Sequence, residues 1–196
     1  MRDAQASVTY YRKDYSPPNH RILKTGLEFD LQPEKTKVTS RLEFEAWSDA
    51  VSADAPLVLD GEDLELVSVV LNGKALSSTE YSRSETQLSI PKAGRQGIVE
   101  ITVYNQPAKN TRLEGLYVSN GNFFTQCEAQ GFRRITYFPD RPDVLSRFEV
   151  TLITHKDTHP VSLSNGNLLE ESALPDGRWM TRWEDPFPKP AYLFAL

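Results

Sequence analysis

The segment from Thr125 to Phe148 holds the side chains of this sequence that are best suited to chemistry. It contains the only cysteine, Cys127, between Gln126 and Glu128. If this part of the chain is an extended strand, Gln126 and Glu128 project from one face while Cys127 points to the other. A carboxylate beside an amide offers several hydrogen-bond acceptors, and no neighbouring lysine neutralises them. The pair is therefore suited to binding a primary ammonium group.

The arginines of the same segment offer a structural role for Glu128. Arg133 and Arg134 follow it closely, and arginine–carboxylate pairs near turns are common. On the residue types alone, an ion pair with one of these arginines is the simpler interpretation of Glu128. Cys127 is interpreted as a small buried apolar group, because no histidine lies nearby to lower the pKa of its thiol.

The rest of the segment has the composition of a packed turn. Pro142 suits the first position of a short helical turn, with Asp143 at its positive end. Its four arginines are expected to pair with Glu128, Asp140 or Asp143; they are Arg133, Arg134, Arg141 and Arg147. The aromatic residues are expected to pack in the interior, although one of them could line a side-chain pocket; they are Phe123, Phe124, Phe132, Tyr137 and Phe138.

The histidines do not have the spacing of a zinc peptidase. His155 and His159 are four residues apart, which on a helix would direct both rings at one metal ion. They flank a short polar stretch before Pro160, a sequence typical of a turn between strands. His20 is distant, and no histidine begins a His-Glu-x-x-His motif. We therefore expect no metal site in this chain.

Charge and composition argue against several classes of partner. The 196-residue chain has a formal net charge of -5, with acidic and basic residues interspersed. Nucleic acids and anionic membranes both require a concentrated basic surface. Residues 1–15 contain no apolar run able to serve as a signal peptide or anchor, and one cysteine cannot form an internal disulfide. We expect a cytoplasmic protein without nucleic-acid or membrane partners.

Hydrophobic residues recur with a period of two, which predicts strands. Residues 22–31 and 36–47 are predicted to form an antiparallel hairpin, and residues 64–71 precede the turn-forming pair Asn72-Gly73. Further predicted strands are 86–90, 98–104, 122–128, 147–154, 161–164, 179–184 and 191–196. No long amphipathic helix competes. The sequence predicts an all-β fold, an antiparallel β-sandwich of curved, packed sheets.

The chain is predicted to form one β-domain, residues 21–196, preceded by an N-terminal arm, residues 1–20. Residues 185–190 are proline-rich and should run extended. The apolar run that follows, 191–196, is interpreted either as the last strand of a complete domain or as a strand cut near the junction with a further domain.

Several blocks of sequence resemble a known family, and they are spread over nearly the whole chain. The blocks are residues 61–69, 113–117, 125–148, 163–167 and 185–196. They resemble the N-terminal domain of bacterial aminopeptidase N, in the gluzincin family of zinc aminopeptidases. The resemblance implies an alanyl-aminopeptidase type of parent enzyme, which removes N-terminal residues from peptides and holds zinc in a catalytic domain after residue 196.

The resemblance also implies roles for two residues. Glu128 would bind the α-ammonium group of the substrate, and Gln126 would lie beside the first side chain. Zinc is expected in the parent enzyme and none in this chain, which should be inactive alone; its partners would be peptide substrates and its own catalytic domain.

Two alternatives to this interpretation remain. The first is a stand-alone β-sandwich module that binds peptide or carbohydrate. The second is the leukotriene-converting branch of the family, which is less favoured because that branch usually has glutamine where this chain has Glu128.

Overall fold

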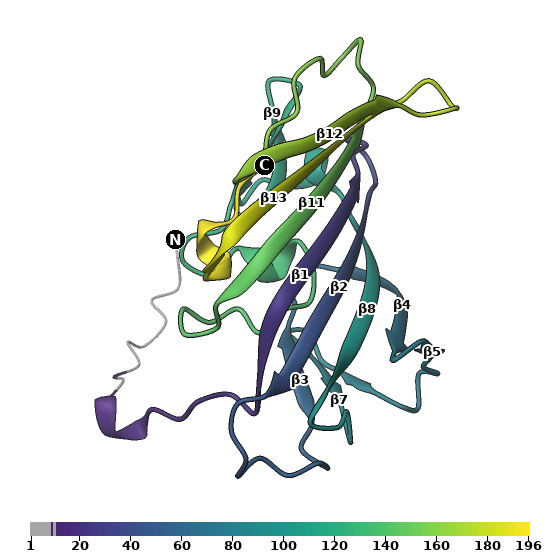
Figure 1. Ribbon diagram of the computed structural model, residues 1–196. Helices are drawn as coiled ribbons and strands as arrows, with labels where there is room; N and C mark the ends of the chain where they lie inside the picture. The colour runs from purple at the N-terminus through teal and green to yellow at the C-terminus, as the bar shows by residue number, and fades with distance from the viewer. Residues whose placement is uncertain (1–8, 10) are drawn as a thin grey trace.

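The computed structural model describes residues 9 and 11–196, whose regular secondary structure consists almost entirely of strands. Eight strands form one large curved sheet in the order β12-β13-β11-β1-β2-β8-β4-β5 (Figure 1). In chain order they are β1 (His20–Asp30), β2 (Thr36–Ala46), β4 (Glu65–Leu71), β5 (Lys74–Ala75), β8 (Gln96–Asn105), β11 (Ser146–Thr154), β12 (Asn167–Ala173) and β13 (Trp179–Lys189).

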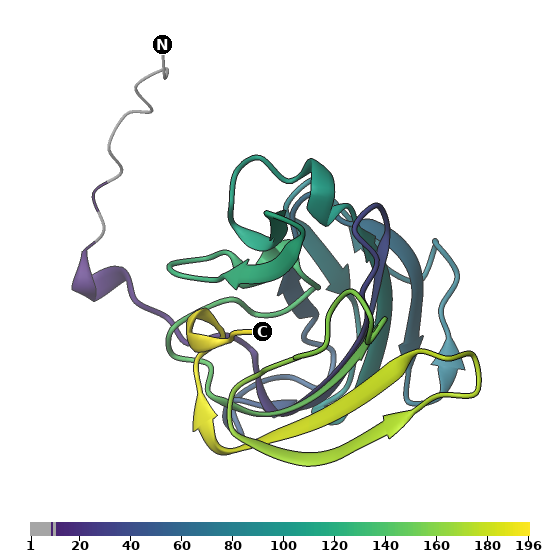
Figure 2. The ribbon, with the colours of Figure 1, turned by 90° about the horizontal axis from the view of Figure 1, so that it is seen from above.

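Two smaller sheets and four short 3₁₀ turns complete the described structure. The three-stranded sheet has the order β3-β7-β6, and the two-stranded sheet is the hairpin of β9 and β10. Their bounds are β3 (Leu57–Asp60), β6 (Ser82–Arg83), β7 (Gln87–Ile90), β9 (Gly115–Ser119) and β10 (Asn122–Gln126). The 3₁₀ turns are η1 (Arg12–Asp14), η2 (Pro107–Lys109), η3 (Phe132–Arg134) and η4 (Ala191–Leu193). In Figure 2 the large sheet curls around the β9–β10 hairpin and the C-terminal end of the chain.

The predicted all-β class and the predicted hairpins are confirmed. β1 and β2 pair in antiparallel fashion, and their buried side chains alternate with exposed ones as the period of two requires. Asn72 and Gly73 both have positive φ, 50° and 81°, in the turn between β4 and β5. The large sheet is nevertheless mixed, because β11 pairs with β1 in parallel. The long connection between β8 and β11, which includes both strands of the small hairpin, gives the chain room for a parallel return.

An aromatic cluster fills the inner side of the large sheet. Phe29 and Phe148 come from β1 and β11, Phe132 and Phe138 from the segment before β11, and Phe194 from the C-terminal turn; all five are buried. The centroid of the Phe132 ring lies 5.1 Å from that of Phe138, 5.9 Å from Phe148 and 5.3 Å from Phe194. The predicted packing role of Phe132, Tyr137 and Phe138 is thereby confirmed.

Two predicted strands are wrong. Residues 161–164 are irregular, and residues 191–196 contain the turn η4 instead of a strand. The turn buries both Ala191 and Phe194, which a regular strand with one buried face could not do, since residues three apart in a strand point to opposite faces. The proline-rich residues before it are extended as predicted, because β13 continues to Lys189.

Several strands have no counterpart in the prediction, and for β3, β9 and β12 the length or the burial of the strand explains why. β12 exposes six of its seven residues and is the edge of the large sheet, so its sequence carries no alternation. β3 and β9 have only four and five residues, too few for a period to stand out.

The predicted N-terminal arm lies partly outside the described residues, which omit 1–8 and 10. Its described part approaches the loop before β11, where the Tyr15 hydroxyl donates to the Asp143 carboxylate at 3.0 Å and Arg141 donates to the Ser16 carbonyl at 2.9 Å. Within residues 9 and 11–196, no helix is long and apolar enough to cross a membrane.

Candidate functional site

Gln126 and Glu128 lie at the end of β10, on the surface of the chain. Gln126 is the last residue of the strand and pairs with Gly115 at the start of β9. Both predicted site residues are exposed, whereas Cys127 between them is only 2% exposed. The Gln126 side-chain amide donates to the backbone carbonyl of Glu128 at 3.3 Å. The Glu128 carboxylate takes no part in this hydrogen bond. The structure therefore brings the two predicted residues together at one exposed edge.

The turn that follows Glu128 depends on two glycines that contact each other and the site. The Gly131 amide donates to the Cys127 carbonyl at 2.8 Å. A Cβ on Gly131 would lie 2.3 Å from the Gln126 carbonyl oxygen, and a Cβ on Gly115 would lie 2.8 Å from the Arg134 Cβ. Gly115 also has φ of 72°, a conformation that side chains disfavour. The backbone at Gln126 is thus packed directly against glycine, a contact that the sequence alone does not indicate.

The two arginines near Glu128 are engaged by other acids. Arg133 pairs with Asp140 at 3.2 Å and lies 3.8 Å from both Asp60 and Glu62. In the part of the chain that the structure describes, neither Arg133 nor Arg134 forms an ion pair with Glu128. The interpretation of Glu128 as an arginine partner is therefore wrong.

Arg134 joins three elements behind the site. It pairs with Glu62 at 2.5 Å, with Glu114 at 3.2 Å and with Asp63, and its side chain is largely buried. Glu114 directly precedes Gly115, so these pairs hold the start of β9 against η3. The arginine network therefore fixes the backbone from which Glu128 projects and leaves the Glu128 carboxylate free of ion pairs with described residues.

The remaining acids of the segment have the structural roles that were predicted for them. Asp143 accepts from Arg141 at 2.7 Å, and this contact lowers the pKa of the Asp143 carboxyl. Asp140 is buried, and burial raises the pKa of its carboxyl above the ordinary range although Arg133 donates to it. Arg141 and Val144 close a turn around Pro142 by a backbone hydrogen bond of 3.2 Å, in place of the helical turn that was predicted.

Cys127 is predicted to be unreactive in the folded domain. Burial raises the pKa of its thiol well above the usual range, so almost no thiolate is present at neutral pH. We expect iodoacetamide to leave Cys127 unmodified in the native chain and to alkylate it fully in urea, as mass spectrometry would report. Rapid alkylation without urea would contradict the buried position.

Each histidine ring contacts another polar group. His155 and His159 lie in the predicted turn, where the His159 amide donates to the His155 carbonyl at 2.8 Å. The His159 ring contacts the Gly121 carbonyl oxygen at 3.0 Å, and the His155 ring meets the side-chain amide of Gln32 at 3.4 Å. Across residues 9 and 11–196, no three His, Cys, Asp or Glu side chains are grouped as metal ligands.

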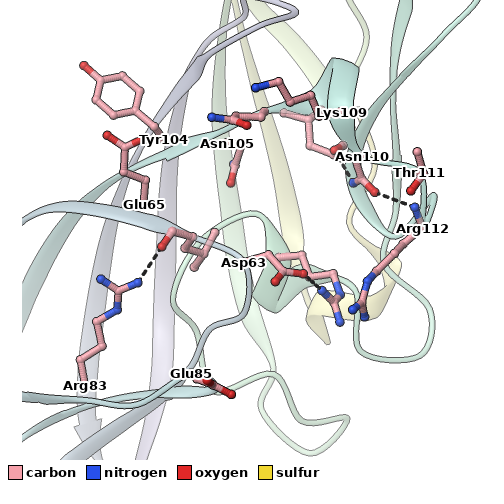
Figure 3. Close-up of a pocket in the computed structure, with 14 residues that line it drawn as sticks. Asp63, Glu65, Arg83, Glu85, Tyr104, Asn105, Lys109, Asn110, Thr111 and Arg112 are labelled. Atoms are coloured by element: carbon pink, nitrogen blue, oxygen red, sulfur yellow. Dashed lines mark hydrogen bonds and ion pairs between the residues drawn. The ribbon is translucent and has the colours of Figure 1, made fainter.

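Two clefts of the described structure are lined by neither Gln126 nor Glu128. The first, of about 820 Å³, lies between the start of β4, the end of β8, η2 and β9, and charged side chains of both signs line it (Figure 3). Arg134 is on its wall, where it pairs with Asp63. The second, of about 480 Å³, lies near Pro17, Pro139 and Arg141. Gln126 and Glu128 are exposed and belong to neither of these two clefts.

Comparison with known proteins gives a family match over nearly the whole chain. Residues 10–193 match the family described as the peptidase M1 N-terminal domain. The chain is similar to aminopeptidase N of Escherichia coli (strain K12), with 47% identity over 189 residues, which are 95% of this chain and 21% of that protein. The chain thus spans about a fifth of the length of the curated relatives that it matches.

Solved structures agree with this match. The structure of Legionella pneumophila aminopeptidase A in complex with aspartic acid superposes with a TM-score of 0.86 at 35% identity, over 93% of this chain and 22% of that one. The M1 zinc metallopeptidase from Deinococcus radiodurans superposes with a TM-score of 0.75 at 15% identity, over 90% of this chain and 41% of that one, a likeness of fold alone.

Proposed function

Because the chain belongs to the peptidase M1 N-terminal domain family, we propose that it is part of a zinc metallo-aminopeptidase that removes N-terminal residues from peptides. Within that enzyme, this domain binds the α-ammonium group of the substrate through Glu128, and Gln126 lies beside the first side chain. The domain alone does not hydrolyse peptides.

The state of Glu128 is the observation that carries this proposal. Its carboxylate is exposed and makes no ion pair with a described residue, although Arg133 and Arg134 are only a few positions away. A carboxylate placed in a closed cleft requires a cation, because a desolvated and unpaired charge is costly. The ammonium group of a peptide N-terminus is such a cation, whereas an internal peptide bond offers none. An enzyme with this residue in its cleft would therefore act at chain ends.

The C-terminal end of the chain supports the same arrangement. The backbone amide of Leu196 donates to the Thr125 hydroxyl at 2.9 Å, so residue 196 lies next to the strand that ends at Gln126 (Figure 2). A catalytic domain joined after residue 196 would begin beside Gln126 and Glu128. The surface at Gln126 and Glu128 and the surface of that catalytic domain can then form one cleft without a long linker.

The described residues do not fit a zinc ion. His155 and His159 both contact other polar groups, and no third ligand lies with them. We therefore assign any zinc ligands to the remainder of the longer protein, and we assign to this chain only the binding and orientation of the substrate.

Comparing the 196-residue chain with the longer protein tests this division of labour. With added zinc, the longer protein should release p-nitroaniline from alanyl-p-nitroanilide, and the 196-residue chain should release none above the background with zinc alone. Appreciable zinc-dependent turnover by the short chain would contradict the proposal, as would a longer protein that has no activity on any aminoacyl anilide.

A further inference from the structure

The β9–β10 hairpin packs against the rest of the chain through one of its faces. On this inner face, the centroid of the Phe123 ring lies 5.1 Å from that of His159. Thr125, two residues further along β10, hydrogen-bonds with Leu196. These contacts occupy the face of β10 that carries the odd-numbered residues, and the even-numbered residues point outward.

The outer face of the hairpin carries a pair of aromatic rings, one exposed and one partly buried, in line with the proposed site. Phe124 is 43% exposed, and its ring stacks on Tyr117 from β9 with a centroid distance of 5.8 Å and an interplanar angle of 26°. The two residues are direct partners in the ladder, so their side chains share one face. Gln126 is two residues beyond Phe124 on the same face, roughly 7 Å along the strand.

We propose that Tyr117 and Phe124 determine specificity, by contacting the side chain of the first residue of the peptide. This inference rests on the proposed function, in which Glu128 binds the ammonium group of that residue. Gln126 lies between Glu128 and the aromatic pair along β10. A first residue that is anchored at Glu128 therefore has its side chain next to Gln126, and a long side chain that continues along the strand reaches the two rings.

The chemistry of this face favours large uncharged side chains. β9 and β10 contain no charged residue, and the ladder partners of the outer face beyond the rings are Asn122 and Ser119. Stacked rings offer a broad apolar surface to another apolar or aromatic group. A methyl group is too short to reach from Gln126 to Phe124, so an alanine side chain gains nothing from the pair.

Substitution of Phe124 in the longer enzyme tests this inference. For Phe124→Ala, we expect kcat/KM on phenylalanyl-p-nitroanilide to fall roughly tenfold, the range of a lost apolar contact, while the value on alanyl-p-nitroanilide stays within about twofold. Tyr117→Ala should change the same ratio in the same direction. Phe187→Ala is the matched control, because Phe187 is 76% exposed on β13, outside the hairpin, and its loss should change neither value.

The outcomes separate this inference from the function on which it rests. If Phe124→Ala lowers both substrates equally, or lowers neither, the aromatic pair does not select the first side chain and the inference is overturned. If Phe124→Ala gives either of these results while the unmodified enzyme is active and the Glu128→Ala variant is inactive, the inference fails but the proposed function stands. If the unmodified enzyme hydrolyses neither anilide, the proposed function fails as well.

Discussion

Replacing Glu128 by alanine in the longer enzyme is expected to lower kcat/KM on an alanyl substrate by roughly a hundredfold to a few thousandfold. Removing one partner of a desolvated charge pair costs about 3–5 kcal/mol, because the other charge is left without compensation. Each 1.4 kcal/mol corresponds to about a tenfold change, which gives the stated range. Glu128→Gln should recover only part of the loss, because it keeps the length and an acceptor oxygen but not the charge.

A matched acid and a pair of inhibitors make this prediction specific. Glu34 is an exposed acid in the turn between β1 and β2, and Glu34→Ala should leave kcat/KM unchanged. A primary-amine competitive inhibitor should bind the unmodified enzyme far more tightly than its deaminated analogue, and Glu128→Ala should abolish that difference. If the variant still prefers the amine, or if Glu34→Ala costs as much as Glu128→Ala, Glu128 does not bind the ammonium group.

The exposure of Gln126 and Glu128 could be predicted from local sequence, because it depends on a local rule. Alternation along a strand requires that Gln126 and Glu128 point away from Cys127, and burial of Cys127 between two exposed neighbours agrees with that rule. Alternation and turn chemistry likewise located the first hairpin and the turn at Asn72-Gly73, since both are set by neighbouring residues.

The partners of Arg134, behind the site, could not be predicted, because they are distant in sequence. Arg134 pairs with Glu62 and Asp63, which precede it by about seventy positions, whereas local reading assigned the arginines to acids of their own segment. The C-terminal turn was misread for a related reason. An apolar run resembles a strand until the position of the aromatic cluster is known, and only that cluster explains why Phe194 turns inward.

Phe132→Ala is expected to cause the largest loss of stability, about 3–5 kcal/mol in the free energy of unfolding of the 196-residue chain. The side chain is fully buried, and its ring contacts Phe138, Phe148 and Phe194. These contacts join the segment after Glu128, the large sheet and the C-terminal turn. A cavity at this point would therefore loosen both the backbone that carries Glu128 and the end of the chain beside it.

Urea denaturation followed by tryptophan fluorescence would measure this loss as a lower midpoint at unchanged slope. Phe187→Ala removes the same side chain from an exposed position, and we expect it to change the free energy of unfolding by less than about 0.5 kcal/mol. Phe132→Leu keeps most of the buried volume and should cost clearly less than alanine. Equal losses for Phe132→Ala and Phe187→Ala would show that the aromatic cluster does not hold these three elements together, and the site would then need a different source of rigidity.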